Sequence, residues 1–223
     1  MDAIDRKILA VLQENAALSV ADHLKLGARL NPGWDEALAS ARIDRLDLDP
    51  GQKAGTLSGG QRAQLALTLA LGKRPALLIL DEPVASLDPL ARREFLQDLM
   101  EAVAEQDLSV VLSSHLIADL ERVCDYLIVL VGSRVRVAGP VEELLATHHL
   151  LTGPRRDPAT LPDGQQVISA SHTDVQSTLL VRTSGPVLDP AWMVSEVALE
   201  DLVLGYMSQA TGRGRRNHLE VQR

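Results

Sequence analysis

Residues 56–88 read T-L-S-G-G-Q-R-A-Q-L-A-L-T-L-A-L-G-K-R-P-A-L-L-I-L-D-E-P-V-A-S-L-D. In its first part, a hydroxyl and two glycines stand at the mouth of an apolar helical pattern. The first turn of a helix has free N–H groups and a positive dipole end, so this pattern predicts an anion site. The residues of that predicted site are Ser58, Gly59, Gly60 and Gln61.

A buried strand follows in the same stretch. Residues 76–80 form an unbroken apolar run, which is typical of a strand buried on both faces of a parallel sheet. The run ends in Asp81 and Glu82, and ligands bind at the carboxyl ends of strands in open parallel sheets. In a phosphate site, Asp81 suits Mg²⁺ and Glu82 suits an attacking water.

The amino-acid composition limits which classes of function are plausible. The 223 residues carry a net charge of −8, which argues against nucleic acid as a partner because phosphate backbones are bound through clustered Lys and Arg. The only cysteine, Cys124, excludes an internal disulfide and fits a reducing cytosol. Because no apolar run approaches the ~20 residues of a membrane span, we expect any membrane link to go through a partner.

Four motifs in order resemble the second half of an ABC-transporter nucleotide-binding domain. They are Leu57-Ser58-Gly59-Gly60-Gln61, the hydrophobic strand with Asp81-Glu82-Pro83, then Ser86-Leu87-Asp88, then Ser113-Ser114-His115. The resemblance covers roughly residues 20–150, and four motifs together are far more specific than any one alone. It implies ATP and Mg²⁺ as cofactors.

The resemblance also implies a role for each motif residue. Asp81 would hold Mg²⁺, Glu82 would polarise the attacking water and His115 would contact the γ-phosphate. In a dimer with a second nucleotide-binding subunit, identical or different, other motif residues of this chain would contact the second subunit's ATP and couple the two ATP sites. The residues implied for those contacts are Ser58, Gly59, Gly60, Gln61 and Asp88.

The first 19 residues do not fit that family. Residues 2–15 form an amphipathic pattern that is similar to the first helix of Lrp/AsnC transcription regulators, although no recognition helix follows. A solvated helix with one apolar stripe is an equal alternative. A third interpretation makes Gln13 the glutamine of the family's Q-loop.

The given sequence contains no phosphate-binding loop. No G-x-x-x-x-G-K-[ST] occurs in residues 1–223, so the loop whose N–H groups and lysine cradle the β- and γ-phosphates is missing from them. The sequence indicates a truncated or rearranged domain whose first half has been replaced. A domain without this loop is expected to be impaired as an ATPase.

The predicted fold is α/β, with an incomplete P-loop NTPase-like ABC ATPase core, a mainly parallel sheet with flanking helices, and a small C-terminal α+β appendage. The expected parts are a foreign helix in 1–19 and a partial ATPase domain in 20–150, with a helical subdomain in 20–57 and the signature to the histidine in 57–115. A linker in 151–164, an appendage in 165–210 and a basic tail in 211–223 follow.

The leading functional hypothesis is the ATP-binding subunit of a bacterial export-type transporter, coupling ATP hydrolysis to transport through a separate transmembrane permease. It would lie in the cytoplasm at the inner face of the membrane, and the missing loop would impair catalysis. One alternative is a non-catalytic remnant that supplies only its signature to an intact partner. The other is a DNA-binding regulator acting through residues 2–19.

Overall fold

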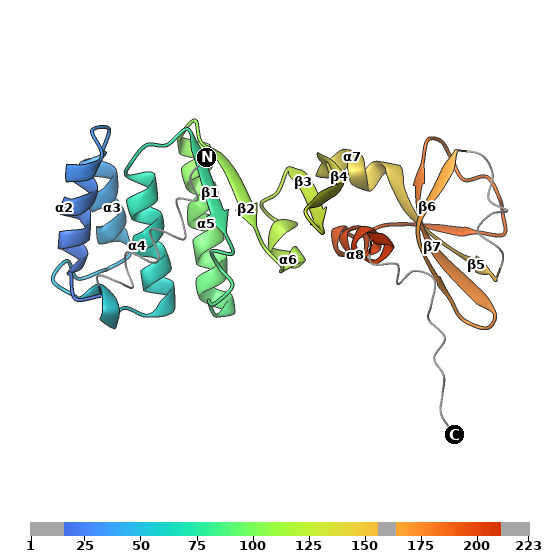
Figure 1. Ribbon diagram of the computed structural model, residues 1–223, viewed down its shortest axis with the longest axis horizontal. Coiled ribbons are helices and arrows are strands. Elements are labelled where there is room, and N and C mark those ends of the chain that lie inside the picture. The colour runs from blue at the N-terminus through green and yellow to red at the C-terminus, as the bar shows by residue number, and fades with distance from the viewer. Residues whose placement is uncertain (1–15, 156–163, 211–223) are drawn as a thin grey trace, which may run out of the picture. The chain divides into compact units, whose positions relative to one another are not determined.

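The computed structural model describes residues 16–155 and 164–210, which fall into two compact units divided after Leu116. The predicted N-terminal helix, Gln13 and the basic tail in 211–223 lie outside the described residues. Each unit is described by itself (Figure 1).

The first unit is built on three helices that precede its sheet. They are α2 (Val20–Leu30), α3 (Glu36–Arg45) and α4 (Gly59–Leu71), with a short 3-10 turn, η1 (Ala54–Thr56), before α4. A capping box between Ser19 and Asp22 starts α2, and the Asp35 side chain caps α3. Helices α2 and α3 lie within residues 20–57, for which the sequence predicted a helical subdomain, and α4 is the apolar helix predicted at the two glycines.

A shared core holds the three helices together. Apolar side chains of all three meet in one buried cluster, and α4 lies between α3 and α5 (Pro89–Glu105) (Figure 1). Arg42 of α3 is buried and donates hydrogen bonds to Thr68 and Gln64 of α4 and to Asp98 of α5. A buried guanidinium satisfied from two other helices fixes how those helices pack.

The sheet of the first unit has two parallel strands, β1 (Leu77–Asp81) and β2 (Ser109–Ser113), joined through α5. Their register places Leu77 opposite Ser109 and Asp81 opposite Ser113, so both strands end at one edge. The parallel pairing confirms the expected core. Among the described residues, however, it is limited to these two strands, and the other paired strands are antiparallel.

The second unit begins with a short helix and a hairpin. Helix α6 (Ile117–Leu120) precedes β3 (Tyr126–Val131) and β4 (Arg134–Pro140), which pair antiparallel. Gly132 and Ser133 at the turn both have positive φ, 58° and 59°, as a two-residue hairpin turn requires. Helix α7 (Val141–Thr147) follows the hairpin.

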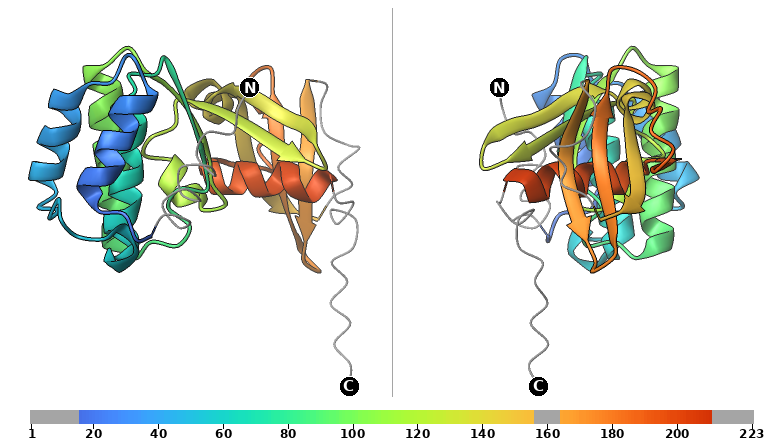
Figure 2. Two further views of the ribbon diagram at one scale, coloured as in Figure 1. Left: turned by 60° about the vertical axis from the view of Figure 1, so that its left-hand side comes forward. Right: turned by 90° about the vertical axis from the view of Figure 1, so that its right-hand side faces the viewer.

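A four-stranded antiparallel sheet completes the second unit, in the order β6 (Gln165–His172), β7 (Gln176–Thr183), β5 (His148–Pro154) and β8 (Met193–Glu196). The predicted linker in 151–164 was wrong at its start, because β5 continues to Pro154 in the centre of this sheet and Leu151 is fully buried. Helix α8 (Leu199–Ala210) packs beside the sheet (Figure 2). Pairing with the distant strand β7 overrode the turn-forming composition of Gly153 and Pro154.

Candidate functional site

The carboxyl ends of β1 and β2 bring together the predicted strand-end residues. Asp81 lies opposite Ser113, whose hydroxyl donates to the Asp81 carboxylate over 2.8 Å. The Glu82 carboxylate accepts a hydrogen bond from Nδ1 of His115 at 2.7 Å, and both side chains are solvent-accessible. An acid pair, a hydroxyl and an imidazole therefore meet at one edge of a parallel sheet, where such sheets bind ligands.

Glu82 has an unusual backbone conformation. Its φ of 53° lies in the left-handed region, which costs a non-glycine residue roughly 1–2 kcal/mol. Its N–H donates to the hydroxyl and the carbonyl oxygen of Ser113 at 2.9 and 3.2 Å, and these bonds hold the strained turn in place. Strain that is over-determined in this way is a mark of functional sites.

Ser113 is a site residue to which sequence reasoning assigned no role. It bonds to both Asp81 and the Glu82 backbone, so it positions the two carboxylate-bearing residues relative to β2. The sequence signal was present in Ser113-Ser114-His115, but the contact depends on the strand register. Only pairing of β1 with β2 places residues 32 positions apart within hydrogen-bonding distance.

The predicted anion-binding residues lie at the start of α4. The Ser58 hydroxyl accepts from the Gln61 N–H at 3.1 Å, and the Gln61 side chain accepts from the Ser58 N–H at 3.0 Å. This capping box satisfies two backbone groups and fixes the entry of the chain into the helix. Both side chains are thus oriented by the helix start itself.

The two signature glycines meet different surroundings. A Cβ at Gly60 would lie 2.9 Å from Cβ of Ala91 in α5, whereas one at Gly59 would meet only Leu87, at 3.9 Å. Gly60 is therefore required by close packing of α4 on α5. The packing in this chain does not explain a glycine at position 59, which leaves the backbone there open to close approach by a ligand.

Asp88 lies beside this helix start, at the beginning of α5. Its carboxylate accepts from the N–H groups of Leu90 and Ala91, both at 3.0 Å, and Pro89 occupies the first helical turn. The contact of Gly60 with Ala91 joins the two helix starts. In this structure Asp88 is an N-cap, while its predicted role in coupling two ATP sites stays a prediction.

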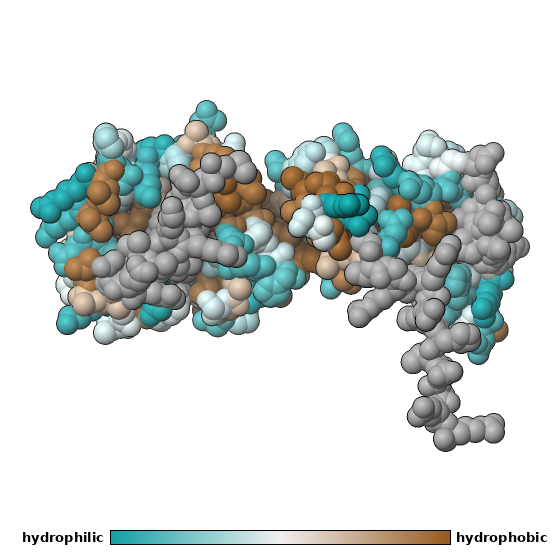
Figure 3. Space-filling view, viewed as in Figure 1, coloured by the Kyte–Doolittle hydropathy of each residue, from teal (hydrophilic) through white to brown (hydrophobic). Residues whose placement is uncertain are grey.

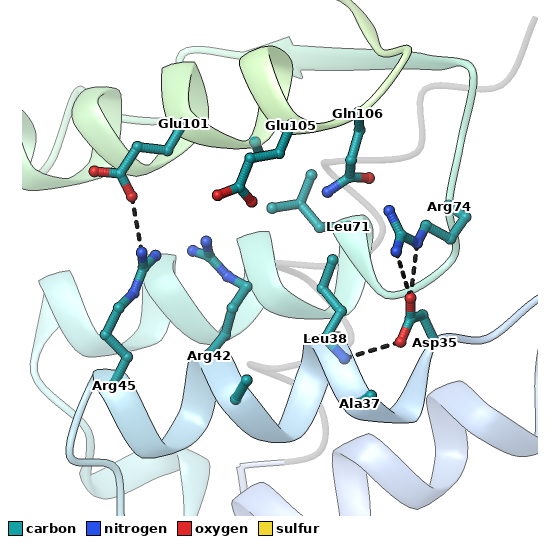
Figure 4. A pocket seen from close by; sticks show the side chains of 12 residues that line it. Asp35, Ala37, Leu38, Arg42, Arg45, Leu71, Arg74, Glu101, Glu105 and Gln106 are labelled. Carbon is teal, nitrogen blue, oxygen red and sulfur yellow. Dashed lines mark hydrogen bonds and ion pairs between the residues drawn. The ribbon is translucent and has the colours of Figure 1, made fainter.

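Two pockets lie near α3 and α5. One, of about 510 Å³, borders the start of α4 through Ser58, Gly60 and Gln61 and also includes carboxylates of α5, two of which pair with Arg45. The other, of about 370 Å³, lies between α3 and the end of α5 (Figure 4). Its three arginines all pair with carboxylates: Arg74 with Asp35, Arg45 with Glu101 and Arg42 with Asp98.

The donor atoms at the strand ends fit part of what ATP hydrolysis requires. Mg²⁺ prefers oxygen ligands and is commonly bound by one or two carboxylates together with substrate phosphates, which matches Asp81 and the hydroxyl of Ser113. The described residues contain no cluster of three or more His, Cys, Asp or Glu that could hold a metal alone. Residues 1–223 offer no glycine-rich lysine loop for the phosphates.

Comparisons with known proteins match parts of the chain. A family profile described as "AAA domain, putative AbiEii toxin, Type IV TA system" matches residues 25–118. The molybdenum import ATP-binding protein ModC of Hahella chejuensis is 39% identical over 133 residues, which are 58% of this chain and 37% of ModC. The ABC transporter ATP-binding protein YtrB of Bacillus subtilis is 37% identical over 97 residues, 44% of this chain and 33% of YtrB.

Solved structures of ABC-transporter ATP-binding proteins also match part of this chain. An ATP-binding subunit of an ABC transporter superimposes with a TM-score of 0.50 at 29% identity and covers 59% of this chain and 56% of its own. A nucleotide-free ATP-binding cassette, at 23% identity and a TM-score of 0.51, supports the fold. The chain thus spans only part of each relative it matches, and no helix in the described residues has the length and apolar character to cross a bilayer.

Proposed function

We propose, on the premise that its homologues are the ATP-binding proteins of ABC transporters, that this chain supplies one part of an ATP-hydrolysing site to such a transporter. The observation that carries the proposal is the contact between Glu82 and His115 at the ends of the two parallel strands. A carboxylate with an imidazole partner at a strand end suits the positioning of a water beside a phosphate.

The roles proposed for the site residues follow from their positions. Asp81, held by the Ser113 hydroxyl, would bind Mg²⁺, and His115 would contact the terminal phosphate of ATP. When bound, Mg²⁺ neutralises charge on the phosphates. Ser58, Gly59, Gly60, Gln61 and Asp88 would act on the nucleotide of a second ATP-binding subunit.

Catalysis by residues 1–223 alone should be weak. Phosphoryl transfer depends on positioning and charge neutralisation, and these residues lack the loop and lysine that hold the β- and γ-phosphates. Each charge-assisted hydrogen bond contributes roughly 1.5–3 kcal/mol, so the loss of several exceeds the ~4–5.5 kcal/mol between micromolar and undetectable binding. We therefore expect no measurable Mg-ATP binding by this chain alone at millimolar nucleotide.

The partners proposed are a transmembrane permease and a second ATP-binding subunit, and the location proposed is the inner face of the cell membrane. The relatives support a transport role, but they include a protein named for molybdenum import and, in Homo sapiens, a phospholipid-transporting ATPase. Export therefore stays a prediction about the direction of transport.

A fusion tests the function directly. A segment carrying G-x-x-x-x-G-K-S from an intact ATP-binding cassette, joined ahead of Ser19, should restore Mg-ATP binding and hydrolysis. In that fusion Glu82→Gln should retain Mg-ATP binding and lose hydrolysis, because the amide keeps the shape but cannot accept a proton. A fusion that binds Mg-ATP but hydrolyses it equally well with glutamine at position 82 would refute the assignment of Glu82.

A second candidate function is a non-catalytic module that offers only its signature to an intact subunit. The intact capping box at Ser58 favours it, because the start of α4 is formed without any phosphate-binding loop. In a mixed dimer, this candidate predicts that substitution of Ser58 lowers hydrolysis at the partner's site. Under the same candidate, Glu82→Gln changes nothing.

A further inference from the structure

A buried histidine joins three elements of the second unit. His148 is the first residue of β5 and its side chain is fully buried. Its Nδ1 lies 2.7 Å from the carbonyl oxygen of Leu144 in α7, and its Nε2 lies 2.9 Å from the hydroxyl of Tyr206 in α8. The rings of His148 and Tyr206 also meet edge to face, with their centroids 5.7 Å apart. One side chain thus links α7, β5 and α8.

These two contacts fix the protonation state of the ring. A carbonyl oxygen can only accept a hydrogen bond, so Nδ1 of His148 must carry the hydrogen. In a neutral imidazole Nε2 then has only a lone pair, which accepts the hydrogen of the Tyr206 hydroxyl. A proton on Nε2 would force that hydroxyl to turn round, and its own hydrogen would then need another acceptor in the core. The docked position of α8 therefore requires a neutral His148.

The surroundings of His148 also disfavour a positive charge on the ring. Burial lowers the pKa of His148 and outweighs the Leu144 carbonyl, which raises it, while Arg182 and His149 add smaller decreases. Arg182 of β7 lies opposite His148 in the strand register, and His149 is the next residue of β5. The acidic residues in the first turns of α7 and α8 are all exposed; they are Glu142, Glu143, Glu200 and Asp201. The charged groups that act on the ring are thus basic.

Helix α8 packs closely on the four-stranded sheet next to this contact (Figure 2). Leu202 and Val203 of the helix are buried in one apolar cluster with Leu180 of β7. At Gly205, the residue before Tyr206, a Cβ would overlap the side chain of Leu180, so helix and strand approach closely there. Loss of the bond to Tyr206 therefore acts at a point where α8 and β7 are in tight contact.

We propose that His148 and Tyr206 form an acid-sensitive contact that holds α8 on the sheet and releases the helix when the ring takes up a proton. The proposal concerns the second unit alone and does not depend on the proposed function. When α8 is undocked, water reaches His148, and the ring regains its ordinary pKa of about 6.5. Because the undocked state binds the proton more tightly, a fall in pH below about 6.5 shifts the chain towards that state. The opening is local, since backbone bonds pair β5 with β7.

Hydrogen exchange of the full chain, followed by mass spectrometry, measures the opening of α8. The opening equilibrium gains up to about tenfold per pH unit below 6.5, so the protection of α8, corrected for intrinsic exchange rates, should fall by up to roughly 30-fold between about pH 7.5 and 5. Peptides from α4 in the first unit serve as an internal reference. A dye for apolar surface would be less specific, because Ile128 and Leu130 of β3 are already 54% and 63% exposed (Figure 3).

Three variants assign the effect to the contact. His148→Gln removes the titratable ring and should leave the protection of α8 independent of pH over this range. His149→Gln is the matched control, because the same substitution one residue along β5 should keep the pH dependence. Tyr206→Phe keeps the aromatic ring and removes only the hydroxyl. In that variant the pKa of His148, measured by NMR of its ring protons, should rise, because the hydroxyl no longer holds the neutral form.

Several results would overturn the proposal. One is a change in the protection of α8 smaller than about twofold, and another is the same pH dependence in His148→Gln as in the unsubstituted chain. Equal loss of protection in β5, β7 and α8 would mean that the whole unit unfolds and that no helix is released. An unchanged pKa of His148 in Tyr206→Phe would show that the hydroxyl does not hold the neutral ring, and this measurement remains decisive if His148→Gln fails to fold.

Discussion

Substituting the two signature glycines separates packing from function. Gly60→Ala places a Cβ 2.9 Å from Cβ of Ala91, whereas carbon atoms in contact ordinarily lie ~3.5–4.0 Å apart. The starts of α4 and α5 must therefore move apart by several tenths of an ångström. Gly59→Ala meets its nearest neighbour, Leu87, at 3.9 Å, which is an ordinary contact.

The magnitudes follow from these distances. Overpacking of a tight contact costs about 1–3 kcal/mol, and alanine in place of glycine in a helix returns roughly 0.5–1 kcal/mol. Gly60→Ala should therefore lower the free energy of unfolding by about 1 kcal/mol, and by at most about 2.5 kcal/mol. Gly59→Ala should leave it unchanged or raise it by up to about 1 kcal/mol.

Urea unfolding followed by far-UV circular dichroism measures both variants. The double variant Gly60→Ala with Ala91→Gly removes the overlapping carbon, so the double-mutant cycle should show a favourable coupling of about 1–3 kcal/mol. If Gly59→Ala were as destabilising as Gly60→Ala, or if Ala91→Gly gave no rescue, the contact between the two helix starts would not be what requires glycine at position 60.

Three further predictions concern buried or capping groups. Burial lowers the pKa of His148, with smaller contributions from Arg182 and His149 that act in the same direction. Below about pH 6.5 the unfolded chain therefore binds a proton that the folded chain does not, and the free energy of unfolding should fall by up to about 1.4 kcal/mol per pH unit. In urea titrations, the stability advantage of the unmodified chain over His148→Gln should shrink as the pH is lowered from about 7 to 5. Arg42→Ala leaves the largely buried Asp98 with Arg45 alone and should cost about 3 kcal/mol in thermal or chemical unfolding; an unchanged midpoint would contradict the packing role of Arg42. Asp88→Ala removes a cap that accepts two N–H groups and should cost about 1 kcal/mol, while Asp88→Ser should cost only a few tenths.

Much of the first unit was predictable because its signals are local. The cap residues Ser58 and Asp88, the proline after Asp88 and the apolar run ending at Asp81 each act within a few residues of chain. Capping, dipole and periodicity are properties of neighbouring residues, so the sequence alone indicated the start of α4 and, to within one residue, the bounds of β1. It also placed Asp81 and Glu82 at a strand end, since the strand ends where the apolar run stops.

Only the tertiary structure decided the contacts between segments that lie far apart in the chain. The bond between Glu82 and His115 spans 33 positions and depends on the register of β1 against β2, and the bond between Arg42 and Asp98 spans 56. Residues 151–154 gave a linker signal, yet they form a buried central strand because β7 and β8 pair with them on both sides. Strand register and helix packing are set by the sum of many contacts across the fold, and the local pattern of residues does not contain that sum.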